Sequence, residues 1–125
     1  MPRFERSGLA EGPVVQGFAA DGFLVDGQVY NALLLTPQGV AAWDAPEFEA
    51  LTIDALGPLL ALDPSPEFVI LGTGPTHRIA PRSLTAALED RGIGIEAMDS
   101  RAAARTWGLL RGEGRWIVAA ILPLR

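Results

Sequence analysis

Two short β-rich runs in the first half of the chain are separated by a turn sequence. Apolar and aromatic side chains recur through residues 18–25 and 28–35, and Asp26-Gly27 stands between the two runs. A two-residue hairpin turn of this kind needs a positive φ at both central positions, which Asp and Gly tolerate well. The pattern therefore predicts a β-hairpin. Residues 40–43, which follow the break at residues 37–39, predict a further short strand.

The pattern changes to a helical one between residues 51 and 62. Apolar residues recur there on one face of a 3.6-residue period, and Thr52 stands where an N-cap is expected. Gly57-Pro58 interrupts the pattern, and a proline inside a helix would kink or split it. The apolar stripe consists of Leu51, Ala55, Leu56, Leu59, Leu60 and Leu62.

In the second half of the chain, strand patterns alternate with helix patterns. Residues 68–71 are apolar on both faces, as a strand inside a covered sheet requires. A helix over 81–91, a strand over 93–97, a helix over 101–111 capped by Ser100 and a strand over 115–122 follow. We therefore predict an α/β protein with three layers, a mixed sheet, an N-terminal β-hairpin and a C-terminal β-α-β-α-β portion.

The chain has 125 residues, of which 49% are hydrophobic and 20% are charged, as expected of one globular domain with one core. We interpret residues 1–125 as a single domain in which residues 1–13 form a loosely ordered leader. The first residues lack the pattern of a secretory signal, and no apolar run reaches the length of about 20 residues that spans a bilayer. We therefore expect a cytoplasmic protein without a transmembrane segment.

The amino-acid composition excludes several kinds of catalytic and metal-binding site. A net charge of -5 disfavours binding to nucleic acid. The chain has no Lys and no Cys, which excludes lysine and thiolate nucleophiles as well as thiolate metal sites. His77 is the only histidine, and no carboxylate run has calcium-loop spacing. We expect no metal and no cofactor, and no catalytic residue is assigned; whether the protein is an enzyme stays open, with a non-enzymatic role favoured.

One loop is a candidate ligand site, since it follows the strand predicted over 68–71. Ligands of open α/β sheets bind at the carboxyl ends of strands, and glycine amides there can face an anion. Two arginines four residues apart on the last helix are candidates for the same pocket. The alternatives are an ordinary strand-to-helix turn, and arginines that are solvated or paired with nearby acids. The candidate residues are Gly72, Thr73, Gly74, His77, Arg78, Arg101 and Arg105.

Two tryptophans are candidates for binding a protein partner. Trp43 stands beside a predicted loop, and Trp107 stands on the last predicted helix next to Arg105. Exposed aromatic side chains dominate the energetics of many interfaces. The alternative is that both rings belong to the core, as most large aromatic side chains do.

Several short motifs together resemble one family. In chain order they are Asp21-Gly22-Phe23, Asp26-Gly27 with Tyr30, Gly72-Thr73-Gly74, Gly92-Ile93 with Glu96 and Met98, residues 103–106, and Glu113-Gly114-Arg115. From Val14 to Leu122 the chain is similar to the small-domain family that includes mitochondrial respiratory complex I assembly factor 3 and the adipogenesis-associated domain protein. The resemblance implies a three-layer fold without an established enzymatic activity. Relatives often carry Cys where this chain has Ala104, so a thiol-based role does not apply here.

Two functional hypotheses follow from the sequence. The first is a non-enzymatic binding or assembly factor that acts through a protein partner, for which a subunit of a membrane complex is one candidate. The second is a binder of a small anion or nucleotide-type ligand, or a weak enzyme, at the loop from Gly72 to Arg78.

Overall fold

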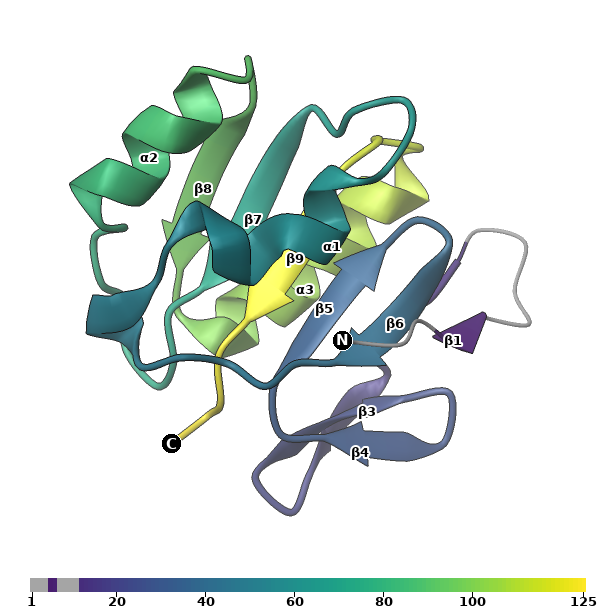
Figure 1. Ribbon diagram of the computed structural model, residues 1–125. Helices are drawn as coiled ribbons and strands as arrows, with labels where there is room; N and C mark the ends of the chain where they lie inside the picture. The colour runs from purple at the N-terminus through teal and green to yellow at the C-terminus, as the bar shows by residue number, and fades with distance from the viewer. Residues whose placement is uncertain (1–4, 7–11) are drawn as a thin grey trace.

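The computed structural model describes residues 5–6 and 12–125, which form two β-sheets and a set of helices (Figure 1). The strands are β1 (Glu5–Arg6), β2 (Gly17–Ala19), β3 (Gly22–Val25), β4 (Gln28–Tyr30), β5 (Leu33–Thr36), β6 (Gly39–Ala42), β7 (Phe68–Gly72), β8 (Gly94–Met98) and β9 (Val118–Ile121). The helices are η1 (Phe48–Ala50), η2 (Ile53–Leu56), α1 (Gly57–Leu60), α2 (Arg82–Glu89) and α3 (Ser100–Gly112), where η denotes a 3-10 helix.

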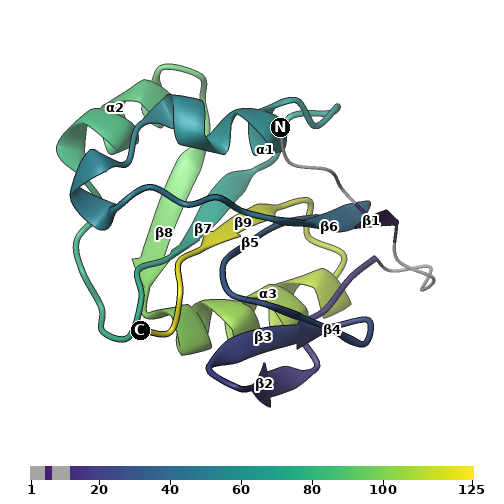
Figure 2. The same cartoon turned by 60° about the horizontal axis from the view of Figure 1, so that its bottom comes forward.

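The larger sheet is mixed and lies between two layers. Its six strands run in the order β1-β6-β5-β9-β7-β8, and β7 pairs in parallel with both β8 and β9. The pairs β5–β6 and β5–β9 are antiparallel. Figure 2 shows α1 and α2 on one face of this sheet, and α3 with the three-stranded sheet β2-β3-β4 on the other. The predicted α/β class, mixed sheet and three layers are confirmed.

Alternation along the central strands divides the core in two. Leu34 on β5 and Val69 and Leu71 on β7 face the α1/α2 layer, whereas Leu33 on β5 and Ile70 on β7 face α3. All of these side chains are buried, because the sheet is covered on both faces. The strand predicted at residues 68–71 is therefore confirmed as an inner strand, with β8 and β9 on its two sides.

The hairpin is confirmed, but its strands are shorter than the predicted runs. Asp26 (φ 49°) and Gly27 (φ 82°) form the turn between β3 and β4. A second turn at Ala20 and Asp21, both with positive φ, separates β2 from β3. The run 28–35 is not one strand, since its second part is β5 of the larger sheet. Three consecutive buried leucines need a sheet covered on both faces, and the small sheet does not provide one.

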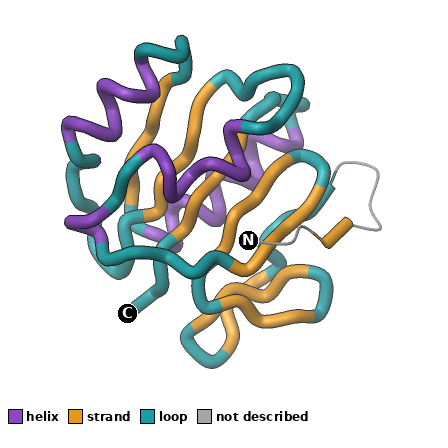
Figure 3. The backbone as a smooth tube through the Cα atoms, viewed as in Figure 1, coloured by secondary structure: helices purple, strands orange, loops and turns teal. Residues whose placement is uncertain are grey.

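The helix predicted between residues 51 and 62 is split in two. A 3-10 turn, η2, ends at Leu56, and the single helical turn α1 starts at Gly57 with Pro58 in its first positions. Thr52 precedes η2, but its side chain forms no capping hydrogen bond. Figure 3 shows these short helical segments crossing one face of the larger sheet. Proline at the start of α1 explains the break, because its nitrogen cannot continue the hydrogen-bond pattern of the preceding turn.

The predicted cap of the last helix is wrong by one residue. Asp99 is the N-cap of α3, and its Oδ1 accepts a hydrogen bond from the Ala102 amide at 3.0 Å. Ser100 is instead the first residue of the helix and is fully buried. Its hydroxyl has other partners, which are described below.

The expected leader over residues 1–13 falls mostly outside the described residues and stays a prediction. Within the described part, Glu5–Arg6 pairs with β6, and the carbonyl of Pro13 accepts a hydrogen bond from Trp107 Nε1 at 2.8 Å. No helix among residues 12–125 combines the length and the apolar character needed to cross a membrane.

Candidate functional site

The predicted site loop leaves β7 where the parallel strands β7 and β8 both end. The chain passes from β7 to α2, which packs on one face of the sheet, and from β8 to α3, which packs on the other. Such a point, where the connections of adjacent strands diverge to opposite faces, is where open α/β sheets bind ligands. The sequence therefore placed the loop correctly in the fold.

Hydrogen bonds within the chain occupy the backbone groups at the ends of β7 and β8. The Thr73 amide donates to the Met98 carbonyl at 2.8 Å, so the β7–β8 pairing continues beyond Gly72. The Gly74 amide donates to Ser100 Oγ at 2.8 Å, and the Ser100 amide donates to the Gly74 carbonyl at 2.8 Å. Thr73 Oγ1 also donates to the Met98 carbonyl at 3.2 Å, so both backbone and side-chain hydrogen bonds join the ends of the two strands.

The hydroxyl groups of Thr73 and Ser100 form further hydrogen bonds in this region. Thr73 Oγ1 donates to the Thr76 carbonyl at 2.7 Å and accepts from the Arg78 amide at 3.1 Å. Ser100 Oγ donates to the Leu122 carbonyl at 2.7 Å, which ties the start of α3 to the residue after β9. The amides of Thr73, Gly74 and Arg78 are therefore engaged inside the chain, and they do not form an anion cradle.

Gly72 and Gly74 have steric reasons for being glycine. A Cβ at Gly72 would lie 2.8 Å from Ile121 Cγ2 and 3.1 Å from Ser100 Cα, so α3 packs directly on the strand backbone. Gly74 has a φ of 101°, which L side chains rarely adopt. Both glycines serve the turn between strand and loop, which was the alternative interpretation of this motif.

A hollow of about 300 Å³ lies beside the loop, on the side of the C-terminal segment. It is bounded by three chain segments and includes two arginines. Arg101 and Arg105 are not among its lining residues, so the structure does not bring the α3 arginines to the loop. The lining consists of Ala45, Pro46, Glu47, Phe48, Thr73, Gly74, Pro75, Arg78, Leu122, Pro123 and Arg125.

Both arginines at the hollow are paired with carboxylates. The Arg78 guanidinium lies 4.0 Å from the centre of the Phe48 ring and pairs with Glu49 at 2.5 Å. The hydrogen bond from Arg78 lowers the pKa of Glu49 below its ordinary value, and the backbone and the charge of Arg78 act in the same direction. Arg125 pairs with Asp21 at 3.1 Å. These ion pairs are exposed, and pairs of this kind contribute little to stability.

The remaining candidates lie apart from one another. His77 is exposed and forms no hydrogen bond or ion pair within the part of the chain that the structure describes. Arg101 lies over the Phe18 ring at 4.9 Å, and Arg105 is exposed on α3. No group of three His, Asp or Glu side chains that could hold a metal ion occurs among the described residues.

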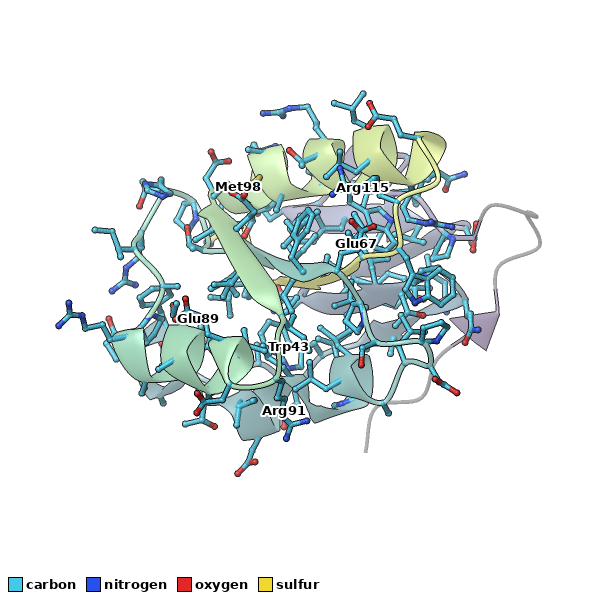
Figure 4. All side chains as sticks on the ribbon, turned by 90° about the horizontal axis from the view of Figure 1, so that it is seen from above. Trp43, Glu67, Glu89, Arg91, Met98 and Arg115 are labelled. Atoms are coloured by element: carbon cyan, nitrogen blue, oxygen red, sulfur yellow. The ribbon has the colours of Figure 1, made fainter. Side chains whose placement is uncertain are left out.

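The two candidate tryptophans are core residues. Trp107 is fully buried between α3 and the sheet, and Trp43 is 7% exposed in the layer of α1 and α2. Figure 4 shows Trp43 in the interior, between the sheet and the helices. Neither ring offers an exposed surface to a partner, so the interpretation of these two residues as interface anchors is corrected in favour of the core alternative.

A polar cluster at the opposite end of β7 was missed by the sequence reasoning. Glu67 and Arg115 lie side by side in Figure 4, and the Glu67 carboxylate accepts from Arg115 Nη2 at 3.0 Å and from the Trp116 amide at 3.1 Å. The hydrogen bond from Arg115 lowers the pKa of Glu67, and the Trp116 amide adds to this effect. The cluster joins the start of β7 to the start of β9. Glu67 and Arg115 are almost fifty residues apart in the sequence, so no local sequence pattern predicts that they are in contact.

Comparisons with known proteins identify relatives over nearly the whole chain. A family model described as "Protein of unknown function (DUF498/DUF598)" matches residues 15–122. A bovine protein named NADH dehydrogenase [ubiquinone] 1 alpha subcomplex assembly factor 3 is 33% identical over 111 residues, which cover 87% of this chain and 60% of the bovine protein. The human protein of the same name is 29% identical over 115 residues. The chain thus spans about 60% of the length of these curated relatives.

Bacterial proteins match over a larger share of their own length. An uncharacterised protein of Rhodobacter capsulatus is 29% identical over 118 residues, covering 94% of this chain and 90% of that protein. The crystal structure of a Bordetella parapertussis protein superposes with a TM-score of 0.82 at 31% identity, covering 94% of this chain and 99% of the other. The fold is therefore shared with a solved bacterial protein over nearly the whole length of both chains.

Proposed function

The chain belongs to the family of proteins of unknown function DUF498/DUF598, and from this membership we propose that it is a non-enzymatic assembly factor that acts on a protein partner. The partner we propose is a subunit of a multi-subunit membrane complex, which the chain binds on the cytoplasmic side of the membrane. The observation that carries the proposal is the 33% identity over 111 residues to a protein named as an assembly factor of NADH dehydrogenase.

The geometry at the ends of β7 and β8 supports this proposal over ligand binding. In sheets that bind a nucleotide or phosphate there, backbone amides and a helix N-terminus are left open to the ligand. Here the Gly74 amide and the start of α3 are joined through Ser100, and Asp99 caps the helix. The carboxylate of Asp99 at this position also opposes the approach of an anion.

Capture of the partner from native membranes tests the proposal. The tagged chain is expressed in its source organism at its native level, and mild crosslinking precedes solubilisation of the membranes. We expect subunits of one membrane complex to be recovered far above a tagged control protein of equal net charge. Recovery of the same background from both proteins, with and without crosslinking, would contradict the proposal.

A further inference from the structure

The outer face of α3 carries a line of exposed residues at helical spacing. Arg101, Arg105 and Leu109 follow one another at intervals of four residues, which places them on one side of the helix. Leu109 is 66% exposed, an unusual position for a leucine on a helix whose other face is buried. The eight residue steps from Arg101 to Leu109 cover about 12 Å along the helix axis.

The charge of this face departs from that of the whole chain. Residues 100–112 contain three of the ten arginines and no acidic residue, whereas the chain as a whole carries a charge of -5. Arg78, Arg115 and Arg125 each pair with a carboxylate. Among the described residues, Arg101 and Arg105 have no such pair. Two exposed guanidinium groups one helical turn apart therefore lie on this face without an ion pair to a carboxylate of the described residues.

Phe18 extends this line at the start of the helix. Its ring is 38% exposed, packs edge-on against Phe23 with 5.9 Å between the ring centres, and lies under the Arg101 guanidinium. Figure 2 shows α3 and the small sheet with β2 in the same layer, on the face of the larger sheet away from α1 and α2. A guanidinium stacked on a ring keeps its N–H groups at its edge, where they can still donate to a carboxylate.

We propose that this α3 face, defined by Phe18, Arg101, Arg105 and Leu109, docks an acidic segment of the partner protein. The inference rests on the proposed function, because it assigns the surface through which that function operates. The segment carries carboxylates for the two arginines and an apolar side chain on each side of them, for Phe18 and for Leu109. Arginine binds carboxylates with two parallel hydrogen bonds, which fixes the register of such a segment.

An anionic lipid surface is the competing occupant, and the observations favour the protein. Two arginines attract an anionic membrane only weakly, and a polybasic cluster normally needs several more positive charges. The chain carries a net charge of -5, so a broad anionic surface would be repelled by the protein as a whole. A narrow acidic segment would contact the two arginines and the apolar residues beside them without extending over the rest of the surface.

Site-specific photocrosslinking in the native host locates the docked segment. A photoreactive phenylalanine analogue is placed at Gly108, where an added Cβ meets no atom within 4 Å, and at the exposed Ala86 on α2 as the control position. We expect the Gly108 probe to crosslink a segment that contains Asp or Glu next to apolar residues. A mapped segment without acidic residues, or equal crosslinking from Ala86, would overturn the proposal.

A pair of double variants with equal charge tests the arginines directly. Arg101→Glu/Arg105→Glu reverses the two charges on α3, and Arg82→Glu/Arg91→Glu reverses two exposed, unpaired charges elsewhere in the described part. We expect recovery of the crosslinked partner to fall by about ten-fold or more in the α3 variant and to stay at the wild-type level in the other. Thermal unfolding of the purified variants checks that both are folded.

The outcomes separate this inference from the proposed function. Equal recovery of a complex subunit by the wild type and the α3 variant would overturn the docking face and leave the assembly role intact. Recovery of no subunit even by the wild type would contradict both. Flotation of the purified chain with vesicles of phosphatidylcholine and phosphatidylglycerol, if abolished by the same double variant, would assign the face to lipid and overturn the protein segment.

Discussion

Gly72 and Ser100 together determine how closely α3 packs on the larger sheet. Gly72 provides the space, since a Cβ there would lie within 3.1 Å of the Ser100 backbone. Ser100 uses that proximity to bind the Gly74 amide and the Leu122 carbonyl from a fully buried position. Buried polar groups that lose such partners destabilise the fold, so the pair is a structural unit at the end of β7.

Replacement of Gly72 and Gly108 by alanine should have opposite effects. Gly72→Ala forces a methyl group into packed atoms, including backbone, and we expect a loss of about 1–3 kcal/mol in the free energy of unfolding. Gly108→Ala adds a methyl group in open space on α3, and we expect a gain of about 0.5–1 kcal/mol. Urea unfolding followed by tryptophan fluorescence measures both. A Gly72→Ala protein as stable as the wild type would show that α3 does not approach β7 this closely.

Glu67 should make stability depend on pH. The hydrogen bond from Arg115 lowers the pKa of Glu67 in the folded protein below its ordinary value of 4.5. The ionised Glu67 therefore stabilises the fold fully above pH 4.5, and this stabilisation is lost as the pH falls through the lower pKa of the folded state. Glu67→Gln should therefore be less stable than the wild type at neutral pH, and the difference should narrow below about pH 4.5. Unfolding curves at several pH values measure this. Glu96→Gln removes a carboxylate that forms no ion pair among the described residues, and it serves as the control for the loss of one negative charge.

Helix α3 depends on Asp99 for its start. The Asp99 carboxylate accepts from the Ala102 amide and thereby satisfies one of the free N–H groups of the first turn. We expect Asp99→Ala to destabilise the protein by about 1 kcal/mol, whereas Asp99→Asn should retain most of the capping effect. Denaturant midpoints of the two variants measure the difference. If both variants lost equal stability, the charge of Asp99 and not its hydrogen bond would be the stabilising feature.

The elements that the sequence predicts well are those with a strong local signal. Asp26-Gly27 predicts the hairpin turn, the apolar run at residues 68–71 predicts β7, and Gly92, with a φ of 73°, lies in the turn between α2 and β8. The elements that differ from the prediction are those whose position depends on tertiary contacts. Leucines 33–35 continue the hairpin pattern, yet they join the larger sheet because only that sheet is covered on both faces. Ser100 has the chemistry of an N-cap, but its hydroxyl is used by Gly74 and Leu122.

In the molecule as a whole, the sequence predicts where the site loop lies but not how it is used. The loop is at the divergence point of α2 and α3, as its place after β7 indicates. The hydrogen bonds that close it come from Met98 and Ser100, about 25 residues further along the chain. Arg101 and Arg105 were correctly predicted to share a helical face, but that face points to Phe18 and solvent. The direction in which a helix face points relative to a distant loop cannot be predicted from the local sequence.

Removal of the gene from the source organism tests the central claim, that this domain serves the assembly of a membrane complex through a protein partner. The measurement is native gel electrophoresis of membranes from the deletion strain, with and without the gene restored. The gel is stained for NADH dehydrogenase activity, because the bovine relative is named as an assembly factor of that enzyme. The proposal predicts fewer mature complexes and an accumulation of subcomplexes, both reversed by the wild-type gene. Identical amounts of mature complex in the deletion and the restored strain would contradict it.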